Sequence, residues 1–437
     1  VLWQFCLPMF GSIIFQQLYN TTDAVIVGNF VGKEALAAVG GSTGTLINLL
    51  VGFFVGLSSG ATVIISQLYG AQRLKEVSDA VHTAVALSIV GSLILMTIGL
   101  IFAPLALEAM GTPDDVMGYA VTYIRIYFCG TVFSLFYNMG AGILRAVGDS
   151  RRPFYFLLVS AVLNTGLDLL FVLKFGMGVE GVAYATIIAQ AVSALLTVWV
   201  LLRAEGCIRL ELRALRMTWS VLKQIVAVGI PAALQMAVTA FSNVFVQGYI
   251  NYFGADCMSG WTAYTKVDQL VILPVQSISM AGTTFVGQNL GVGDTPRAKK
   301  GVRTALYLSF AVTAVLLVPV LLLAPELTAF FNQKPEVVSY GALLLRLLSP
   351  FYFFFCINQV YSAALRGAGN SQVPMWIMLG SFVVFRQIYL FVVANYVANE
   401  IIPIALSYPA GWFLCSAATL IYYSRCRFDK HRLVEDV

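Results

Sequence analysis

The sequence predicts an all-α polytopic membrane protein with twelve transmembrane helices in two six-helix lobes. Of the 437 residues, 59% are hydrophobic and only 11% are charged, and the mean hydropathy is +0.84. About a quarter of the residues of a soluble domain are charged. The apolar residues fall into twelve long runs, and the second half of the chain repeats motifs of the first. The composition excludes an ordinary soluble enzyme and a disordered chain.

The twelve apolar runs are bounded by charged residues, glycine or proline, and each can cross a bilayer as a helix. They cover residues 2–28, 35–68, 80–103, 117–143, 153–173, 181–203, 221–251, 258–290, 302–324, 337–364, 374–396 and 402–424. Pro8 and Pro231 lie inside their runs and predict kinks. Gly52, Gly56 and Gly60 follow a GxxxGxxxG spacing, which predicts close helix packing.

The basic residues of the connections between the runs predict the orientation. One set of connections, with the C-terminal tail, holds 19 Lys and Arg residues, whereas the opposite set holds three, Lys33, Lys174 and Lys334. The larger set comprises Arg73, Lys75, Arg145, Arg151, Arg152, Arg203, Arg209, Arg213, Arg216, Lys223, Arg297, Lys299, Lys300, Arg303, Arg366, Arg425, Arg427, Lys430 and Arg432. Basic connections stay in the cytoplasm. We therefore expect a multi-pass protein of the cell membrane, the plasma or inner membrane, with both termini cytoplasmic.

An internal repeat has an offset of 221 residues. At this offset segment 66–70 aligns with 287–291, segment 144–150 aligns with 365–371, and Pro153 aligns with Pro374. Two lobes result, residues 1–210 and 211–437, joined by a basic segment near 204–220. Because each lobe has an even number of spans, both have the same orientation, which makes this a parallel repeat. A symmetric pair of bundles is what transport by alternating access requires.

Zinc, disulfide and nucleotide sites are not indicated by the sequence. The seven cysteines form no CxxC pair, and the two histidines, His82 and His431, lie beside basic segments, which argues against a disulfide framework and a zinc centre. The glycine-containing loop 28–34 has three residues between its glycines rather than the four of a phosphate loop. We expect no cofactor other than a coupling ion, no nucleotide or nucleic acid partner, and no enzymatic activity. The chain opens in an apolar stretch at Val1 and shows no cleavable signal peptide.

Several charged residues remain inside the spans, where each is costly unless it faces protein or water. They are Asp23, Arg125, Asp168, Lys266, Asp268, Arg346 and Arg386. Asp23 and Asp168 lie five to six residues from the outer ends of their spans, which places both ~8–9 Å below that surface. Thr186 lies at a similar depth. Asn164 is one turn from Asp168 on the same helical face.

Asp23, Asn164, Asp168 and Thr186 form a candidate cation or proton coupling site. Two carboxylates in a medium of low dielectric cannot both remain ionised at little cost, so the pair is expected to hold a proton or a cation. Carboxylate and carbonyl oxygens are the ligands that a hard cation prefers, so these four residues would be the metal ligands if Na⁺ is the coupling ion. The alternative is two separately bonded aspartates with a structural role.

The second lobe lacks these acids. At equivalent positions Tyr389 replaces Asp168, and Val246 replaces Asp23. Ion coupling is therefore predicted in the first lobe alone.

The other charges within the spans are less specific. Lys266, Asp268 and Arg386 are possible cavity or lobe charges, and plain structural pairing is an equal alternative for them. Arg125 and Arg346 recur at equivalent places in the two lobes, which favours a structural role.

These motifs together resemble the multidrug and toxic compound extrusion (MATE) transporters over essentially the whole chain. The matching segments are Pro8…Asn20-Thr21-Thr22-Asp23…Gly28, Gly60-Ala61-Thr62…Gln67…Gly70, Leu144-Arg145-Ala146-x-Gly148-Asp149, Asn164-x-x-x-Asp168, Gly181-Val182-x-x-Ala185-Thr186 and Phe285-Val286-Gly287-Gln288-Asn289. The resemblance implies a secondary active multidrug efflux antiporter that exports organic cations or drugs in exchange for H⁺ or Na⁺.

The sequence looks like the DinF-like branch of that family, which implies a coupling site at Asp23, Asn164, Asp168 and Thr186. Another branch uses a carboxylate in the seventh span, and this chain has no acid between residues 234 and 249. The expected partners are small organic cations or drugs and the lipid bilayer, and the expected state is a monomer.

Two alternative functions differ in the charges that they require. A flippase for lipids or lipid-linked saccharides would need several cations in its cavity, for which Lys266, Arg346 and Arg386 are available. An intramembrane hydrolase would use Asp23 and Asp168 as a catalytic dyad, but it does not account for two lobes.

Overall fold

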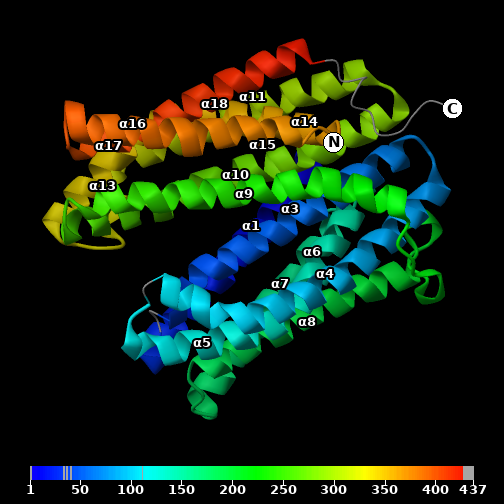
Figure 1. The fold of residues 1–437 in the computed structure, drawn as a ribbon, viewed down its shortest axis with the longest axis horizontal. Helices are drawn as coiled ribbons and strands as arrows, with labels where there is room; N and C mark the ends of the chain where they lie inside the picture. The colour runs from blue at the N-terminus through cyan, green and yellow to red at the C-terminus, as the bar shows by residue number, and fades with distance from the viewer. Residues whose placement is uncertain (1, 33–34, 36–37, 40–41, 111, 427–437) are drawn as a thin grey trace. The chain divides into compact units, whose positions relative to one another are not determined.

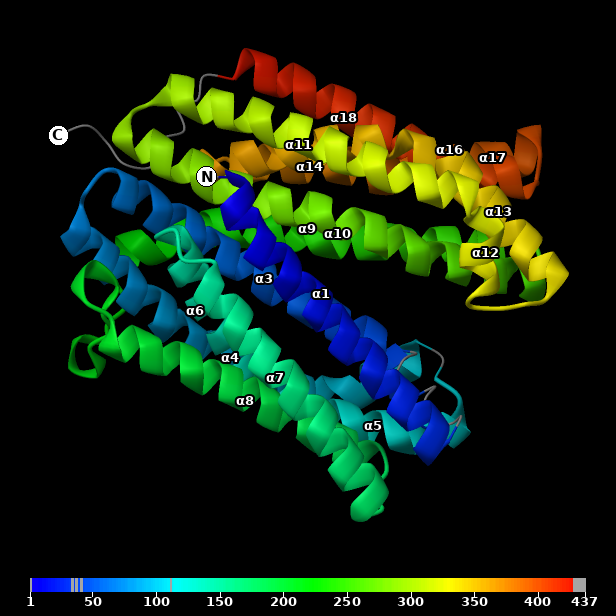
Figure 2. The ribbon, with the colours of Figure 1, turned by 180° about the vertical axis from the view of Figure 1, so that it is seen from behind.

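The computed structural model describes residues 2–32, 35, 38–39, 42–110 and 112–426. Across these residues the chain is helical, and they contain no β-strand (Figure 1, Figure 2). The predicted all-α class is confirmed. Some residues that entered the sequence analysis lie outside the described residues: Lys33, Arg427, Lys430, His431 and Arg432.

The first half of the chain forms α1 to α8. The helices are α1 (Leu2–Ile26), α3 (Ser42–Gly70), α4 (Leu74–Ala109), α5 (Asp114–Cys129), α6 (Thr131–Ala146), α7 (Arg151–Leu169) and α8 (Val179–Arg203). Short π-helical turns extend two of them, η1 (Val27–Val31) after α1 and η2 (Leu170–Lys174) after α7.

The second half forms α9 to α18. The helices are α9 (Trp219–Asn251), α10 (Ala255–Val292), α11 (Thr295–Leu322), α12 (Ala324–Ala329), α13 (Pro335–Leu348), α14 (Tyr352–Gly367), α15 (Gln372–Met378), α16 (Arg386–Val392), α17 (Ile401–Ala405) and α18 (Ser407–Arg425). A 3-10 turn, η5 (Ser349–Phe351), joins α13 to α14. The π-helical turns η6 (Leu379–Phe385) and η7 (Val393–Val397) continue α15 and α16 into one span.

The helices have the length and apolarity of membrane spans. In the described part of the chain, ten helical segments are long and apolar enough to cross a membrane, and the bent pair α5–α6 makes an eleventh if it is one span. The 25-residue helix α1 is the first predicted span. Helices suit a bilayer because they satisfy their own backbone groups where no water is present. A multi-pass membrane protein is thus confirmed.

The span predicted at residues 117–143 is broken near its middle. Helices α5 and α6 meet at Gly130 with a bend of 49°. A Cβ atom at Gly130 would lie 2.6 Å from Ile187 Cγ1 of α8, so only glycine allows α8 to pack this closely at the break. The apolar run predicted the span but not this bend.

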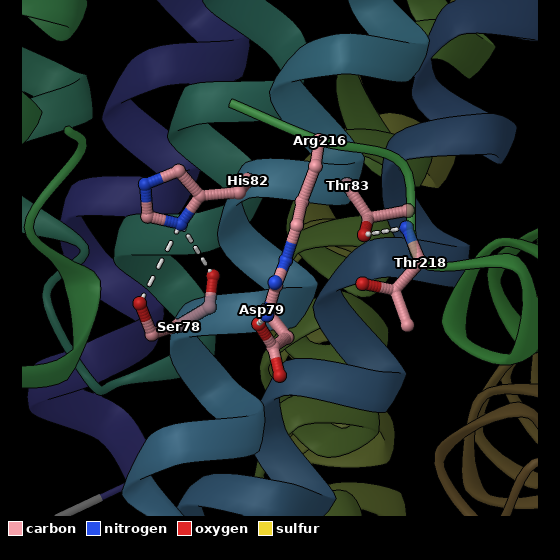
Figure 3. Close-up of polar contacts among 6 residues, drawn as sticks. All are labelled: Ser78, Asp79, His82, Thr83, Arg216 and Thr218. Carbon is pink, nitrogen blue, oxygen red and sulfur yellow. Dashed lines mark hydrogen bonds and ion pairs between the residues drawn. The ribbon is translucent and has the colours of Figure 1, made fainter. Parts of the chain in front are cut away.

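The chain divides into two compact units. The first unit comprises Leu7–Ala233, and the second comprises the described residues from Leu234 onward together with α1 up to Cys6. The division falls inside α9, just beyond Pro231, whereas the boundary predicted from the sequence is at 210/211. The difference arises because the connection at residues 204–218 is bonded to α4 (Figure 3).

Glycines on α3 allow close packing inside the first unit. A Cβ atom at Gly56 would lie 2.3 Å from Ala233 Cα, and one at Gly60 would lie 2.4 Å from Ile225 O. The GxxxG spacing therefore does mark a helix contact, between α3 and the first part of α9.

Candidate ion-coupling site

Three helices of the first unit bring the four predicted site residues together. Asp23 comes from the last turn of α1, Asn164 and Asp168 come from α7, and Thr186 comes from α8. All four side chains are buried, and none is more than 4% exposed. Asn164 and Asp168 share one face of α7 because they are four residues apart.

Asp23 is at the centre of the cluster. The Thr186 hydroxyl lies 3.3 Å from Asp23 Oδ2, and it also donates to the Val182 carbonyl of its own helix at 2.9 Å. The Asp23 carboxyl lies against the side chains of Asp168 and Asn164 as well. The four residues thus make one site, as the depth argument predicts.

Most polar atoms of this site lack a hydrogen bond of normal geometry. These buried atoms are Asp23 Oδ1, both carboxyl oxygens of Asp168 and both polar atoms of the Asn164 side chain. In the described part of the chain, no Lys, Arg or His forms an ion pair with either aspartate. A buried charge without a partner is costly, so the site is suited to a proton or to a cation such as Na⁺ that neutralises the acids.

Two further polar residues extend the site. Gln190 Nε2 donates to the Tyr127 hydroxyl at 3.4 Å, and Tyr127 interacts electrostatically with Asp23. Gln190 Oε1 is buried without a hydrogen-bond partner. Neither residue was predicted from the sequence. Gln190 is one turn beyond Thr186 on α8, which is a signal that could have identified it, whereas Tyr127 gave no such signal.

Apolar side chains and two π-helical turns surround the acids. The cluster of Ile26, Val27, Tyr123, Val172 and Val182 packs beside the site. The turns η1 and η2 begin within four residues of Asp23 and Asp168, respectively. Such π turns are frequent at functional sites. The apolar packing keeps the acids away from bulk water.

Three other predicted charges lie in the second unit. Arg386 is 2% exposed; its Nη1 donates to Ser242 Oγ at 3.0 Å, and its guanidinium carbon lies 4.6 Å and 4.5 Å from the ring centroids of Phe382 and Tyr408. These contacts give Arg386 a packing role that links α9, α16 and α18.

The two charges on α10 are separate from each other. The Tyr264 hydroxyl donates to Asp268 Oδ1 at 3.4 Å, whereas Lys266 is exposed. No ion pair joins Lys266 to Asp268 among the described residues. The spacing of two residues on a helix explains why they point to different faces.

Arg125 and Arg346, the repeated pair, are both exposed. Arg346 Nε donates to the Leu321 carbonyl at 3.4 Å. It also lines an open cavity of about 630 Å³ with Pro325 and Pro335.

Comparison with known proteins decides the family. The family model described as MatE matches residues 8–170 and again residues 231–392. The chain belongs to the MatE family. The two matches, one in each half, agree with the predicted repeat. This MatE protein is a membrane transporter and not an enzyme.

Curated relatives of this MatE chain align over most of its length. The probable multidrug resistance protein YoeA of Bacillus subtilis is 28% identical over 426 residues, which are 96% of this chain and 92% of that protein. The probable multidrug resistance protein NorM of Thermotoga maritima is 26% identical over 98% of this chain and 92% of that protein. The FAD transporter of Shewanella oneidensis is 23% identical over 84% of this chain and 81% of that protein.

Solved MATE structures share the fold. A crystal structure of MATE in the bent conformation aligns with a TM-score of 0.91 at 22% identity, over 97% of this chain and 94% of that chain. An outward-facing multidrug resistance MATE family transporter of the MOP superfamily aligns with a TM-score of 0.91 at 21% identity, with the same coverage. The predicted MATE-like fold class and the resemblance are confirmed.

Proposed function

We propose that this MatE protein is a secondary active multidrug efflux antiporter that exports organic cations or drugs in exchange for H⁺ or Na⁺. The observation that carries the proposal is the buried pair Asp23 and Asp168, which has no cationic partner among the described residues. Two such acids are costly to bury within membrane spans, and an ion that binds between them offsets this cost.

The exchange follows from differential affinity. A proton or Na⁺ binds between Asp23 and Asp168, with the Thr186 hydroxyl and the Asn164 amide as further polar groups. The bound ion stabilises one conformation and the drug stabilises the other, because a ligand shifts an equilibrium only by its difference in affinity for the two states. Release of the ion and of the drug on opposite sides then produces antiport.

The substrate class is supported by the relatives. Several of them carry names that denote multidrug resistance or export. One is named a FAD transporter, so flavins belong among the compounds that are tested. The flippase alternative receives less support, because Arg386 is engaged by Ser242 and two aromatic rings.

We also propose a monomer in the cell membrane with both termini in the cytoplasm. The bias of basic residues, 19 against three, supports this orientation. Single-cysteine labelling with an impermeant reagent tests it. Positions near Asp114 and Glu336 should react from outside, and positions near Arg73, Arg151 and Arg297 should not. External labelling near Arg151 would reverse the orientation.

The function is tested in proteoliposomes under separate gradients of protons and sodium. Ethidium and tetraphenylphosphonium serve as cationic probes, FAD as an anionic one and a fluorescent phospholipid as the flippase substrate. We expect one gradient to drive uptake of the cationic probes, and Asp168→Asn to remove that dependence. Drug transport that depends on neither gradient would contradict the antiporter proposal. Lipid translocation without drug transport would favour the flippase alternative.

A further inference from the structure

The connection between α8 and α9, residues 204–218, is an ordered surface. It contains two 3-10 turns, η3 (Gly206–Ile208) and η4 (Leu212–Ala214). The Leu210 N–H donates to the Leu201 carbonyl of α8 at 2.9 Å, and the Leu210 side chain is buried. The connection thus folds back toward the first unit.

Three side chains of α4 fasten this connection, and Figure 3 shows the contacts of two of them, Asp79 with Arg216 and Thr83 with Thr218. Asp79 Oδ1 accepts from Arg216 Nη2 at 2.7 Å. Thr83 Oγ1 accepts from the Thr218 N–H at 3.1 Å, and His82 Nε2 accepts from the Glu211 N–H at 3.0 Å.

The His82 contact has a defined proton position. His82 Nδ1 lies 2.7 Å from the Ser78 carbonyl oxygen (Figure 3). A carbonyl oxygen only accepts, so Nδ1 carries the proton and Nε2 is free to accept from Glu211. The contacts of Asp79, His82 and Thr83 hold the connection from residue 211 to residue 218.

The fastened connection presents large apolar side chains outward. Trp219 is 76% exposed, Leu212 is 66% exposed and Met217 is 41% exposed. Arg209, before Leu212, and Arg213, after it, are also exposed, and neither forms an ion pair within the described part of the chain. Apolar and cationic groups thus alternate on one short segment.

The position of the segment places this surface at the membrane boundary. The connection leaves a span at Arg203 and enters the next span at Trp219. Arg203 stacks on Trp199, with 4.9 Å between the guanidinium carbon and the ring centroid. Tryptophan is enriched at the headgroup level of membranes, and Arg pairs well with phosphate.

We propose that residues 209–219 form a preformed binding surface for anionic phospholipid headgroups. Arg209 and Arg213 contact the phosphates, while Leu212 and Trp219 enter the boundary between headgroups and acyl chains. The acids Glu205 and Glu211 lie in the same connection and offset Arg209 and Arg213 in number, and Arg216 is paired with Asp79. The positive excess comes from Arg203 at the start of the connection. Because α4 already orders the segment, binding costs less conformational entropy than it would for a flexible loop.

The first test compares lipid binding by matched variants of the full chain. Purified protein is titrated with phosphatidylglycerol or phosphatidylcholine, and bound lipid is measured by native mass spectrometry. Arg209→Gln with Arg213→Gln should weaken phosphatidylglycerol binding by roughly 30-fold and leave phosphatidylcholine binding unchanged. Lys299→Gln with Lys300→Gln removes two exposed charges elsewhere and should have no such effect. Equal losses in both variants, or no preference for phosphatidylglycerol in the unmodified protein, overturn the proposal.

The second test locates the contact. A bimane probe is attached at Leu212→Cys after Cys129, Cys207 and Cys426, the cysteines that are not buried, are replaced by serine. In vesicles, brominated phosphatidylglycerol should quench the probe. An unquenched probe would mean that the surface faces water and suits a soluble partner, which refutes the proposal. Neither test measures transport, so a failure of the lipid-binding proposal can be distinguished from a failure of the antiporter proposal.

Discussion

The Thr186 hydroxyl lies 3.3 Å from Asp23 Oδ2 but only 2.9 Å from the Val182 carbonyl of its own helix. A hydroxyl has one proton to donate, and the shorter contact holds it more strongly. Asp23 Oδ2 therefore receives only a weak hydrogen bond, although 163 residues separate the partners. The oxygen atoms of both residues remain available to a bound ion.

This relationship predicts the effect of changes at Thr186. Thr186→Val retains the shape and removes the hydroxyl oxygen as a ligand, so sodium affinity should fall roughly tenfold, the equivalent of about 1.4 kcal/mol. Proton affinity should not fall, because a hydrogen bond to the carboxylate favours its ionised form. Thr186→Ser retains the hydroxyl and should behave almost like the unmodified protein. The measurement is the sodium or proton concentration that gives half-maximal efflux. Equal behaviour of the Val and Ser variants would exclude Thr186 from the site.

Replacement of either buried acid should abolish coupling. Asp23→Asn and Asp168→Asn keep the shape and remove the group that binds the ion. We expect both proteins to fold, because neither acid has an ion-pair partner to lose among the described residues, and both to lose gradient-driven efflux.

The matched control for these acids is Asp256→Asn, which breaks only the exposed ion pair with Lys334. Such a pair contributes about 0–1 kcal/mol, so efflux should persist. Unmodified coupling in Asp23→Asn and Asp168→Asn would refute the assignment of the site.

Ion dependence should be insensitive to changes in the second unit. The Tyr389 hydroxyl donates to the Pro403 carbonyl at 3.1 Å, so Tyr389→Phe should cost about 1 kcal/mol of stability. It should not shift the dependence of efflux on pH or sodium. Asn164→Ala, in the first unit, should shift it. If efflux assays show that Tyr389→Phe shifts the ion dependence and Asn164→Ala does not, the assignment of the coupling site to the first unit is wrong.

Close packing of α3 predicts a contrast between two glycines. A Cβ atom at Gly56 would lie 2.3 Å from Ala233 Cα, whereas nothing lies within 4 Å of one at Gly118. Gly56→Ala should therefore destabilise the protein by about 1–3 kcal/mol. Gly118→Ala, within α5, should be neutral or stabilising by about 0.5–1 kcal/mol. Thermal unfolding in detergent compares the two variants, and an unchanged midpoint for Gly56→Ala contradicts the packing.

The sequence alone determined the fold class and most of the candidate site. Apolar runs report membrane spans because the bilayer penalises every exposed polar group. The spacing of Asn164 and Asp168 placed both on one helical face, since the helical period is fixed. Depth along the spans then put Asp23 and Thr186 at the level of Asp168. Each of these inferences uses only distance along the chain.

Only the tertiary structure decided which helices meet. The contact of Tyr127 and Gln190, the bend at Gly130 and the bond from Glu211 to His82 join segments that are distant in sequence. The sequence predicts that residues 204–218 are a basic linker between the lobes, whereas in the structure they are part of the first unit. The physical reason is that the packing of two helices depends on the shapes of both of their surfaces. The sequence periodicity of one helix describes the surface of that helix and not which partner it contacts.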